Sequence, residues 1–176
     1  MKNMRLCGTD PFTRITLLSI FAVLCSSCHQ NFDSRQWGEA HNGLRIHIDT
    51  VFQAKQGPKI ILFFQNSSEK PLQFYQSWFW LNTAIQCLTI ETGENAKPTP
   101  EGKHLLDLLS PGGVRSRNVL VTLSPGQVYE GESVELQNVY HLAKGLSYRV
   151  KCVYTEALAG GWSGAITSNI SSFRVN

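Results

Sequence analysis

Apolar and polar residues alternate with a period of two along several short segments of the chain. Leu44, Ile46 and Ile48 alternate with polar neighbours, and the segment 146–155 repeats the pattern. This period predicts half-buried β-strands, because successive side chains of a strand point to opposite faces. Turn residues separate the segments at a spacing of roughly 8–12 residues, which is typical of an all-β sandwich. The expected strands are 44–49, 59–64, 72–81, 84–92, 119–123, 128–136, 146–155 and 165–175.

Helical periodicity is confined to one short segment, 100–109, in which four leucines could cover one face of a helix. This segment belongs to a long connection, 95–113, that is punctuated by Pro and Gly. Connections of this length usually wrap a domain or form a functional loop. We expect this one to wrap the sandwich, because the leucines need a dry environment.

The segment 15–24 is an unbroken hydrophobic run of 10 residues, with basic Lys2, Arg5 and Arg14 before it and small residues after it. This order of features predicts an export signal. The run is too short to cross a bilayer, which takes about 20 residues in a helix. We therefore expect a cleaved signal peptide over 1–27, a polar tether over 28–42 on which Trp37 docks back, and one domain over 43–176.

The end of the signal, Ser26-Ser27-Cys28, resembles the lipobox of bacterial lipoproteins, although Cys25 stands where that family usually has Leu. The resemblance implies that Cys28 carries the lipid and that the protein is anchored in the bacterial cell envelope. A second route also fits, in which a general signal peptidase cuts after Ser27 and the chain is periplasmic or secreted.

The charge of the whole chain, +3, owes much to the signal. Without Lys2, Arg5, Arg14 and Asp10, the 16 basic and 13 acidic residues become 13 and 12. No basic cluster remains, so electrostatics support neither a nucleic-acid partner nor attraction to an anionic membrane surface. The membrane is expected as a partner only through lipid on Cys28.

Three stretches of the chain carry a second resemblance. These are FFQNSSEKPL, LSPGQVYEGESVEL and the terminal GGWSGAITSNISSFRV. They are similar to strand and turn features of secreted immunoglobulin-like domains and of small bacterial proteinase-inhibitor sandwiches. The resemblance implies an immunoglobulin-like antiparallel β-sandwich of seven or eight strands. It says little about function, because these features concern packing.

Cys87 and Cys152 are the cysteines that remain once the signal is removed and Cys28 is set aside for lipid. Exported proteins meet an oxidising compartment, so the two are a possible disulfide. The alternative is a pair of small buried hydrophobic residues.

The histidines fall into none of the spacings that bind metal, and no nucleophile elbow accompanies them. We therefore expect no metal, no cofactor and no enzymatic activity. Asn66 and Asn169 begin glycosylation-acceptor patterns, which carry no default meaning in a bacterium.

Aromatic residues gather in the segment 72–81 and return at Trp162 in a glycine-rich loop. In a strand, Trp78 and Trp80 point to one face and Tyr75 to the other. Tyr75, Trp78, Trp80 and Trp162 are therefore a possible binding surface. We favour the alternative, in which the strand aromatics pack in the core or under the long loop and Trp162 fills its own loop.

These observations lead us to expect a non-catalytic envelope lipoprotein that acts as a recognition or assembly module, with an unknown protein or glycan partner. Two alternatives remain open. One is a protease inhibitor that uses an exposed loop within 93–117, and the other is a carbohydrate-binding module that uses the aromatic face.

Overall fold

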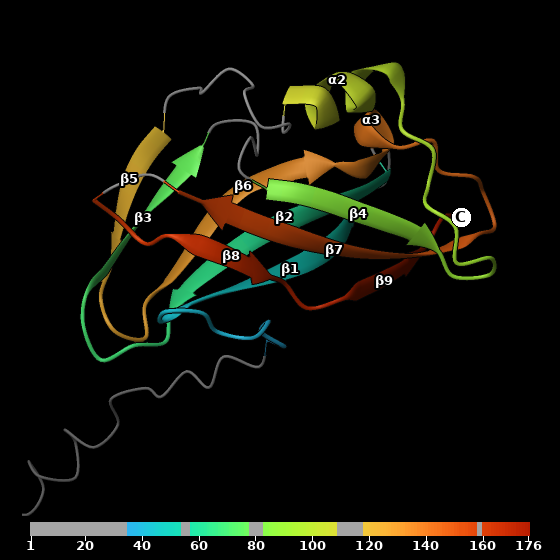
Figure 1. Cartoon of the computed structure of the whole chain (residues 1–176). Coiled ribbons are helices and arrows are strands. Elements are labelled where there is room, and N and C mark those ends of the chain that lie inside the picture. Colours follow the sequence, from blue (N-terminus) through green and yellow to red (C-terminus); the bar gives the residue numbers. More distant parts are fainter. Residues whose placement is uncertain (1–34, 54–56, 78–82, 109–117, 158–159) are drawn as a thin grey trace, which may run out of the picture. The chain divides into compact units, whose positions relative to one another are not determined.

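The computed structural model describes residues 35–53, 57–77, 83–108, 118–157 and 160–176. These residues form an antiparallel β-sandwich with two short helices, so the expected all-β fold is confirmed (Figure 1). The signal, Cys28, Trp78 and Trp80 lie outside the described residues. The elements in chain order are β1 (Leu44–Gln53), β2 (Gly57–Asn66), β3 (Leu72–Ser77), β4 (Thr83–Thr89), α2 (Pro100–Leu108), β5 (Asn118–Leu123), β6 (Val128–Glu135), α3 (Leu136–Val139), β7 (Ser147–Glu156), β8 (Gly164–Thr167) and β9 (Ser171–Arg174).

One layer of the sandwich is the antiparallel sheet β1-β2-β6. Strand β1 pairs with β2 along its whole length. The pairing of β2 with β6 shifts between Ile61 and Phe63, which is the signature of a bulge. Gly131 sits at this irregularity, where an added Cβ would lie 3.1 Å from both the Leu62 carbonyl oxygen and the Phe64 ring. The bulge therefore favours a residue without a side chain.

The opposite layer is built around β7, which pairs with β4 on one edge and with β8 and β9 in succession on the other. The single strand expected over 165–175 is thus two strands, β8 and β9, separated at residues 168–170. Strands β3 and β5 form a separate antiparallel ribbon at one end of the sandwich (Figure 1). The described residues therefore hold nine strands, against the seven or eight expected.

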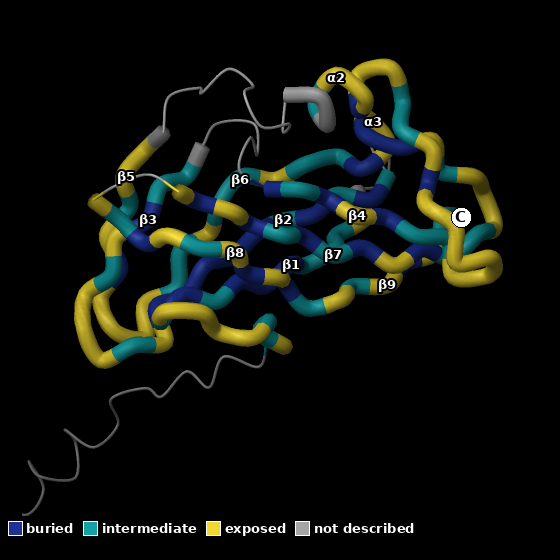
Figure 2. The backbone as a smooth tube through the Cα atoms, viewed as in Figure 1, coloured by how far each residue is buried: buried dark blue, intermediate teal, exposed yellow. Residues whose placement is uncertain are grey.

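Aromatic rings join the three sheets at the centre of the molecule. Phe64 of β2 stacks on Phe74 of β3 at 4.5 Å between centroids and meets Tyr154 of β7 edge-on at 5.2 Å. None of the three is more than 1% exposed. Figure 2 shows the buried residues running along the middles of the strands, with exposed residues in the connections. Rings in these offset and edge-on geometries add stability beyond the apolar area that they bury.

An asparagine side chain joins the two layers of the sandwich along the edge of β1. The amide of Asn169, between β8 and β9, accepts a hydrogen bond from the Ile48 N–H at 2.7 Å and donates one to the Ile48 carbonyl oxygen at 3.1 Å. It thereby satisfies both backbone groups of a β1 residue, as a neighbouring strand would. The Thr50 and Ser171 hydroxyls add a contact of 2.8 Å along the same edge.

The outer face of the sheet β1-β2-β6 is covered by the chain just before β1. The Arg35 guanidinium lies 4.2 Å from the centre of the Phe63 ring, and Trp37 packs against His47 at 5.7 Å. Phe63 and His47 are consequently only 6% and 4% exposed. The compact unit begins at Arg35, so residues 35–42 of the expected tether belong to the domain.

The helix expected at 100–109 is confirmed as α2. The Thr99 hydroxyl caps it by accepting the Gly102 N–H at 2.8 Å, and Pro100 occupies the first turn. Gly102 is needed because a Cβ there would lie 1.9 Å from the Val139 carbonyl oxygen of α3. Two backbone hydrogen bonds attach the connection before α2 to the sandwich. Ala96 N–H donates to the Cys87 carbonyl oxygen, and Thr99 N–H donates to the Val139 carbonyl oxygen.

Candidate binding groove

Two of the four expected surface aromatics lie at the β3–β5 end of the sandwich. Tyr75 is half-buried on β3, and Trp162 is buried, with 6% of its surface exposed. The Trp162 indole N–H donates to the His41 carbonyl oxygen at 2.8 Å, and its ring packs on Tyr154 at 5.5 Å. Trp162 therefore packs into the end of the domain and holds its own loop in position. Its ring is not exposed for stacking on a ligand.

The loop that carries Trp162 lies flat against strand β3. The Trp162 backbone N–H donates to the Gln73 carbonyl oxygen. An added Cβ on Gly161 would lie 3.3 Å from the same oxygen and 3.4 Å from the Tyr75 ring. Gly160 has a φ of +93°, which L side chains rarely adopt. The glycine pair thus allows a close approach that larger residues would prevent.

A tight turn brings a further polar side chain to the same place. His41 and Leu44 exchange backbone hydrogen bonds of 2.9 and 3.0 Å across Asn42-Gly43. Both central residues have positive φ, 48° and 81°, which is the type I′ turn that Asn-Gly favours. The turn places Asn42 beside the glycine-rich loop.

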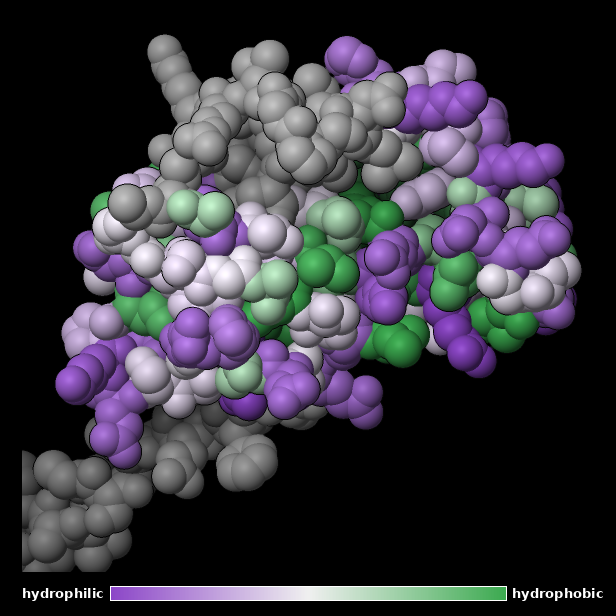
Figure 3. Space-filling model, viewed as in Figure 1, coloured by the Kyte–Doolittle hydropathy of each residue, from purple (hydrophilic) through white to green (hydrophobic). Residues whose placement is uncertain are grey.

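These segments enclose an open groove of about 560 Å³. Its polar side chains are Asn42, Gln73, Thr122 and Ser163, and Pro71 and Leu72 add apolar surface. Among the residues that the structure describes, the lining contains no acidic, basic or histidine side chain. The groove can therefore donate and accept hydrogen bonds, while its own side chains offer no general acid or base. In Figure 3 the β3–β5 end of the molecule is coloured mainly pale to purple, although two large hydrophobic side chains of β5, Val119 and Leu120, are 53% and 44% exposed.

No spacing in the sequence links these residues. Asn42, Gln73 and Thr122 are isolated polar residues on three separate segments, and only the three-dimensional pairing of β3 with β5 joins the last two. The Gln73 amide donates to the Thr122 hydroxyl at 3.1 Å across that pair. The Asn-Gly dipeptide and the Gly160-Gly161 pair are the local signals from which this end of the domain could have been inferred.

The two cysteines lie on neighbouring strands and face the core. Cys87 stands opposite Val150 and Cys152 opposite Ile85, so the thiols occupy diagonal positions. Diagonal neighbours lie about 7–8 Å apart, beyond the usual disulfide range of about 4.4–6.8 Å between Cα atoms. Both are buried free thiols in the structure, in place of the disulfide that the sequence suggested. Burial raises the pKa of Cys87 from 9.0 to about 12 and also raises the pKa of Cys152.

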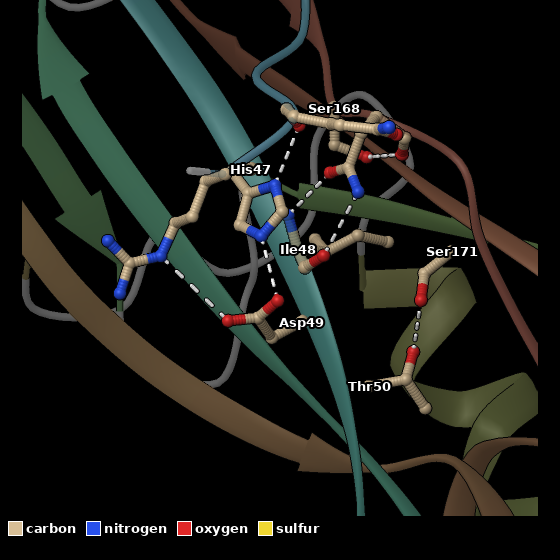
Figure 4. Close-up of polar contacts among 9 residues, drawn as sticks. His47, Ile48, Asp49, Thr50, Ser168 and Ser171 are labelled. Carbon is tan, nitrogen blue, oxygen red and sulfur yellow. Dashed lines mark hydrogen bonds and ion pairs between the residues drawn. The ribbon is translucent and has the colours of Figure 1, made fainter. Parts of the chain in front are cut away.

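His47 is held by polar contacts on both sides of its ring (Figure 4). Its Nδ1 lies 2.7 Å from the Gln36 carbonyl oxygen and its Nε2 lies 2.8 Å from Asp49 Oδ1. These contacts tie the segment before β1 to the sheet, which is a structural role. Among the residues that the structure describes, no group of three or more His, Cys, Asp or Glu side chains could hold a metal ion.

The described part of the loop expected for an inhibitor is tied to the sandwich. Leu88 and Asn95 form a β-bridge, and Pro98 and Tyr140 form another. The Tyr140 hydroxyl donates to the Ile85 carbonyl oxygen at 2.6 Å, and burial raises its pKa. The remainder of that loop, residues 109–117, lies outside the described residues.

Comparison with protein-family models finds no match, and a search of curated proteins finds none either. Within the described part of the chain, no helix is long and apolar enough to cross a membrane.

Proposed function

We propose that the chain is a lipoprotein of the bacterial cell envelope, anchored through Cys28, whose β-sandwich acts as a recognition module without catalysis of its own. The observation that carries the recognition role is the groove beside the Gly160–Ser163 loop. Its amide and hydroxyl groups are suited to holding a ligand by hydrogen bonds, and its lining has no titratable side chain to act on one.

The anchoring part of the proposal rests on the sequence. A basic start, an apolar run of 10 residues and Ser26-Ser27-Cys28 follow the order of a lipoprotein signal. The domain begins at Arg35, a short distance along the chain from Cys28. A lipid on Cys28 would hold the recognition domain close to the membrane surface, because an extended chain spans at most about 3.3–3.6 Å per residue.

Labelled palmitate tests the anchor in a bacterial host. The wild-type chain is expected to incorporate the label and to fractionate with membranes, and Cys28→Ala is expected to lose the label. Cys25→Leu is the matched control, since it removes a neighbouring thiol and gives the signal the leucine that a lipobox usually has. Equal labelling of the wild type and Cys28→Ala would show that Cys28 does not carry the lipid.

A further inference from the structure

We infer that the groove between β3 and the Gly160–Ser163 loop binds a neutral oligosaccharide. The inference rests on the recognition role proposed above and names its ligand class. It does not use the aromatic platform expected from the sequence, since Trp162 is buried and Trp78 and Trp80 lie outside the described residues. Hydrogen-bonding side chains and a small apolar strip take the place of stacked rings.

The size and openness of the groove suit a short chain of sugar units. Its volume of about 560 Å³ falls within the range of about 300–1,000 Å³ that is common for small-molecule sites. It is an open groove on the surface and not an enclosed cavity, so an oligosaccharide can lie along it and extend beyond its ends.

The polar groups match a ligand with many hydroxyls. The Asn42 amide presents a donor and an acceptor side by side, and the Ser163 hydroxyl can do either. Gln73 and Thr122 hydrogen-bond to each other at 3.1 Å, which leaves the Gln73 side-chain carbonyl oxygen, its second N–H and the Thr122 hydroxyl proton for a ligand. Neighbouring hydroxyls of a sugar need the same mixture. Pro71 and Leu72 offer apolar surface for the C–H groups of the sugar ring.

The described residues of the lining carry uncharged side chains, which favours a neutral ligand. A carboxylate, phosphate or ammonium group that entered the groove would lose hydration without meeting an opposite charge from a lining side chain. A neutral sugar exchanges its hydrogen bonds to water for hydrogen bonds to amides and hydroxyls, at little net cost.

The backbone geometry disfavours an extended peptide as the ligand. Peptides usually bind such domains by adding a strand to a free sheet edge. Here the Gln73 carbonyl already accepts from Trp162 N–H, and the other edge of β3 pairs with β5. The groove therefore presents side chains to the ligand, while the edge of β3 at Gln73 is occupied.

Calorimetric titration of the full chain in a sugar-free detergent tests the inference. The neutral probes are maltotriose, cellotriose and chitotriose, used up to about 10 mM so that a site with a Kd of about 1 mM is nearly saturated. Trigalacturonate is the acidic counterpart and the peptide Gly-Ser-Gly-Ser is the peptide control. At least one neutral trisaccharide is expected to bind, and neither control should.

Two exposed glutamines on strands provide a matched pair of variants, since Gln73 lines the groove and Gln86 lies on β4 away from it. Gln73→Ala is expected to weaken trisaccharide binding about fivefold to tenfold, in line with the loss of one or two hydrogen bonds. Gln86→Ala should bind as the wild type does. Ser163→Ala removes a hydroxyl from the loop and is also expected to weaken trisaccharide binding, which provides a second, independent test.

Three results would overturn the inference. The first is that no neutral trisaccharide binds. The second is that Gln73→Ala and Gln86→Ala weaken trisaccharide binding equally. The third is that the peptide or trigalacturonate binds in place of the trisaccharide and depends on Gln73. If the chain binds a trisaccharide but takes up no palmitate, the oligosaccharide inference is supported and the lipoprotein proposal is wrong.

Discussion

Two asparagine side chains form hydrogen bonds with backbone N–H and C=O groups that a neighbouring strand would otherwise satisfy. Asn66 is completely buried, and its amide donates to the carbonyl oxygens of Lys70 and Leu123 at 2.7 and 3.0 Å. Its Oδ1 accepts from the Ser68 N–H at 2.9 Å. Asn169 binds both backbone groups of Ile48. The two glycosylation-acceptor patterns in the sequence are therefore structural motifs, in which the asparagine is needed for its donor and acceptor together.

Asn169→Ala is expected to destabilise the domain by about 2 kcal/mol, because it leaves the N–H and C=O of Ile48 without their partner. Urea unfolding measures the loss, and the Ile48 amide should exchange its hydrogen faster. Asn138→Ala is the control, since Asn138 is exposed and its side chain makes a long contact of 3.4 Å with Glu135, while its hydrogen bond from Thr99 uses the backbone carbonyl oxygen. Equal stability of the two variants would show that the junction of the two layers does not depend on Asn169.

The buried thiols predict how stability changes at alkaline pH. Burial raises the pKa of Cys87 from 9.0 to about 12, so the folded state disfavours the thiolate. The unfolded chain releases this proton near pH 9, which stabilises the unfolded state. The contribution of Cys87 to stability is therefore present below about pH 9 and is lost between about pH 9 and 12.

Thermal melts over this pH range should show a falling melting temperature, with a shallower fall in Cys87→Ala. Iodoacetamide should label Cys87 and Cys152 only after unfolding, because the thiolate is the reactive form. Labelling of Cys87 or Cys152 in the native protein at pH 8.5, located by peptide mass spectrometry, would contradict their buried, protonated state.

At the scale of elements, the sequence predicted strands well and their boundaries less well. Strict alternation located β1 and β7, because the period of two reflects one buried face. Alternation could not show that the outer face of β1 is also covered. Trp37 and Arg35 bury that face together with His47; the sequence predicted that Trp37 docks back onto the domain, but not that Arg35 and the rest of 35–42 belong to it. Coverage of this kind depends on tertiary contacts that no local pattern encodes.

The docked segment before β1 is expected to contribute to stability through Trp37. Trp37→Ala removes the ring that packs on His47 and is contacted by the Arg45 guanidinium at 5.2 Å. A loss of about 1.5–3 kcal/mol in urea unfolding is expected from the lost burial. The Gly38 N–H, which donates to the Ile46 carbonyl at 2.9 Å, should exchange faster.

Gln36→Ala is the control for the same segment. Its side chain is exposed, and the described contact with His47 uses the backbone carbonyl oxygen. If Trp37→Ala and Gln36→Ala were equally stable, the segment would not be part of the folded unit.

At the scale of the whole molecule, the fold was more predictable than the site. Alternation and turn spacing are repeated along the chain, so errors at single strands do not change the class of fold. The groove has no such redundancy. It forms where the Asn42 turn, β3, β5 and the Gly160–Ser163 loop meet, and each segment contributes only one or two polar groups. Of the aromatic residues in the sequence pattern, Trp162 is buried by the loop that it anchors, Tyr75 is half-buried, and Trp78 and Trp80 lie outside the described residues.

Anchoring and recognition should therefore be separable properties of the chain. All groove residues lie between Asn42 and Ser163, within the unit Arg35–Asn176, and none depends on Cys28 or the signal. A chain that starts at His29 should keep the melting temperature of the full chain. It should bind the trisaccharide with a Kd within about twofold of the full-chain value, a difference of about 0.4 kcal/mol, and should no longer fractionate with membranes. Calorimetry and fractionation of the two chains check both halves of this expectation. A folded chain from His29 that bound the sugar much more weakly would show that residues before Arg35 take part in the groove, and that lipid attachment and recognition are coupled.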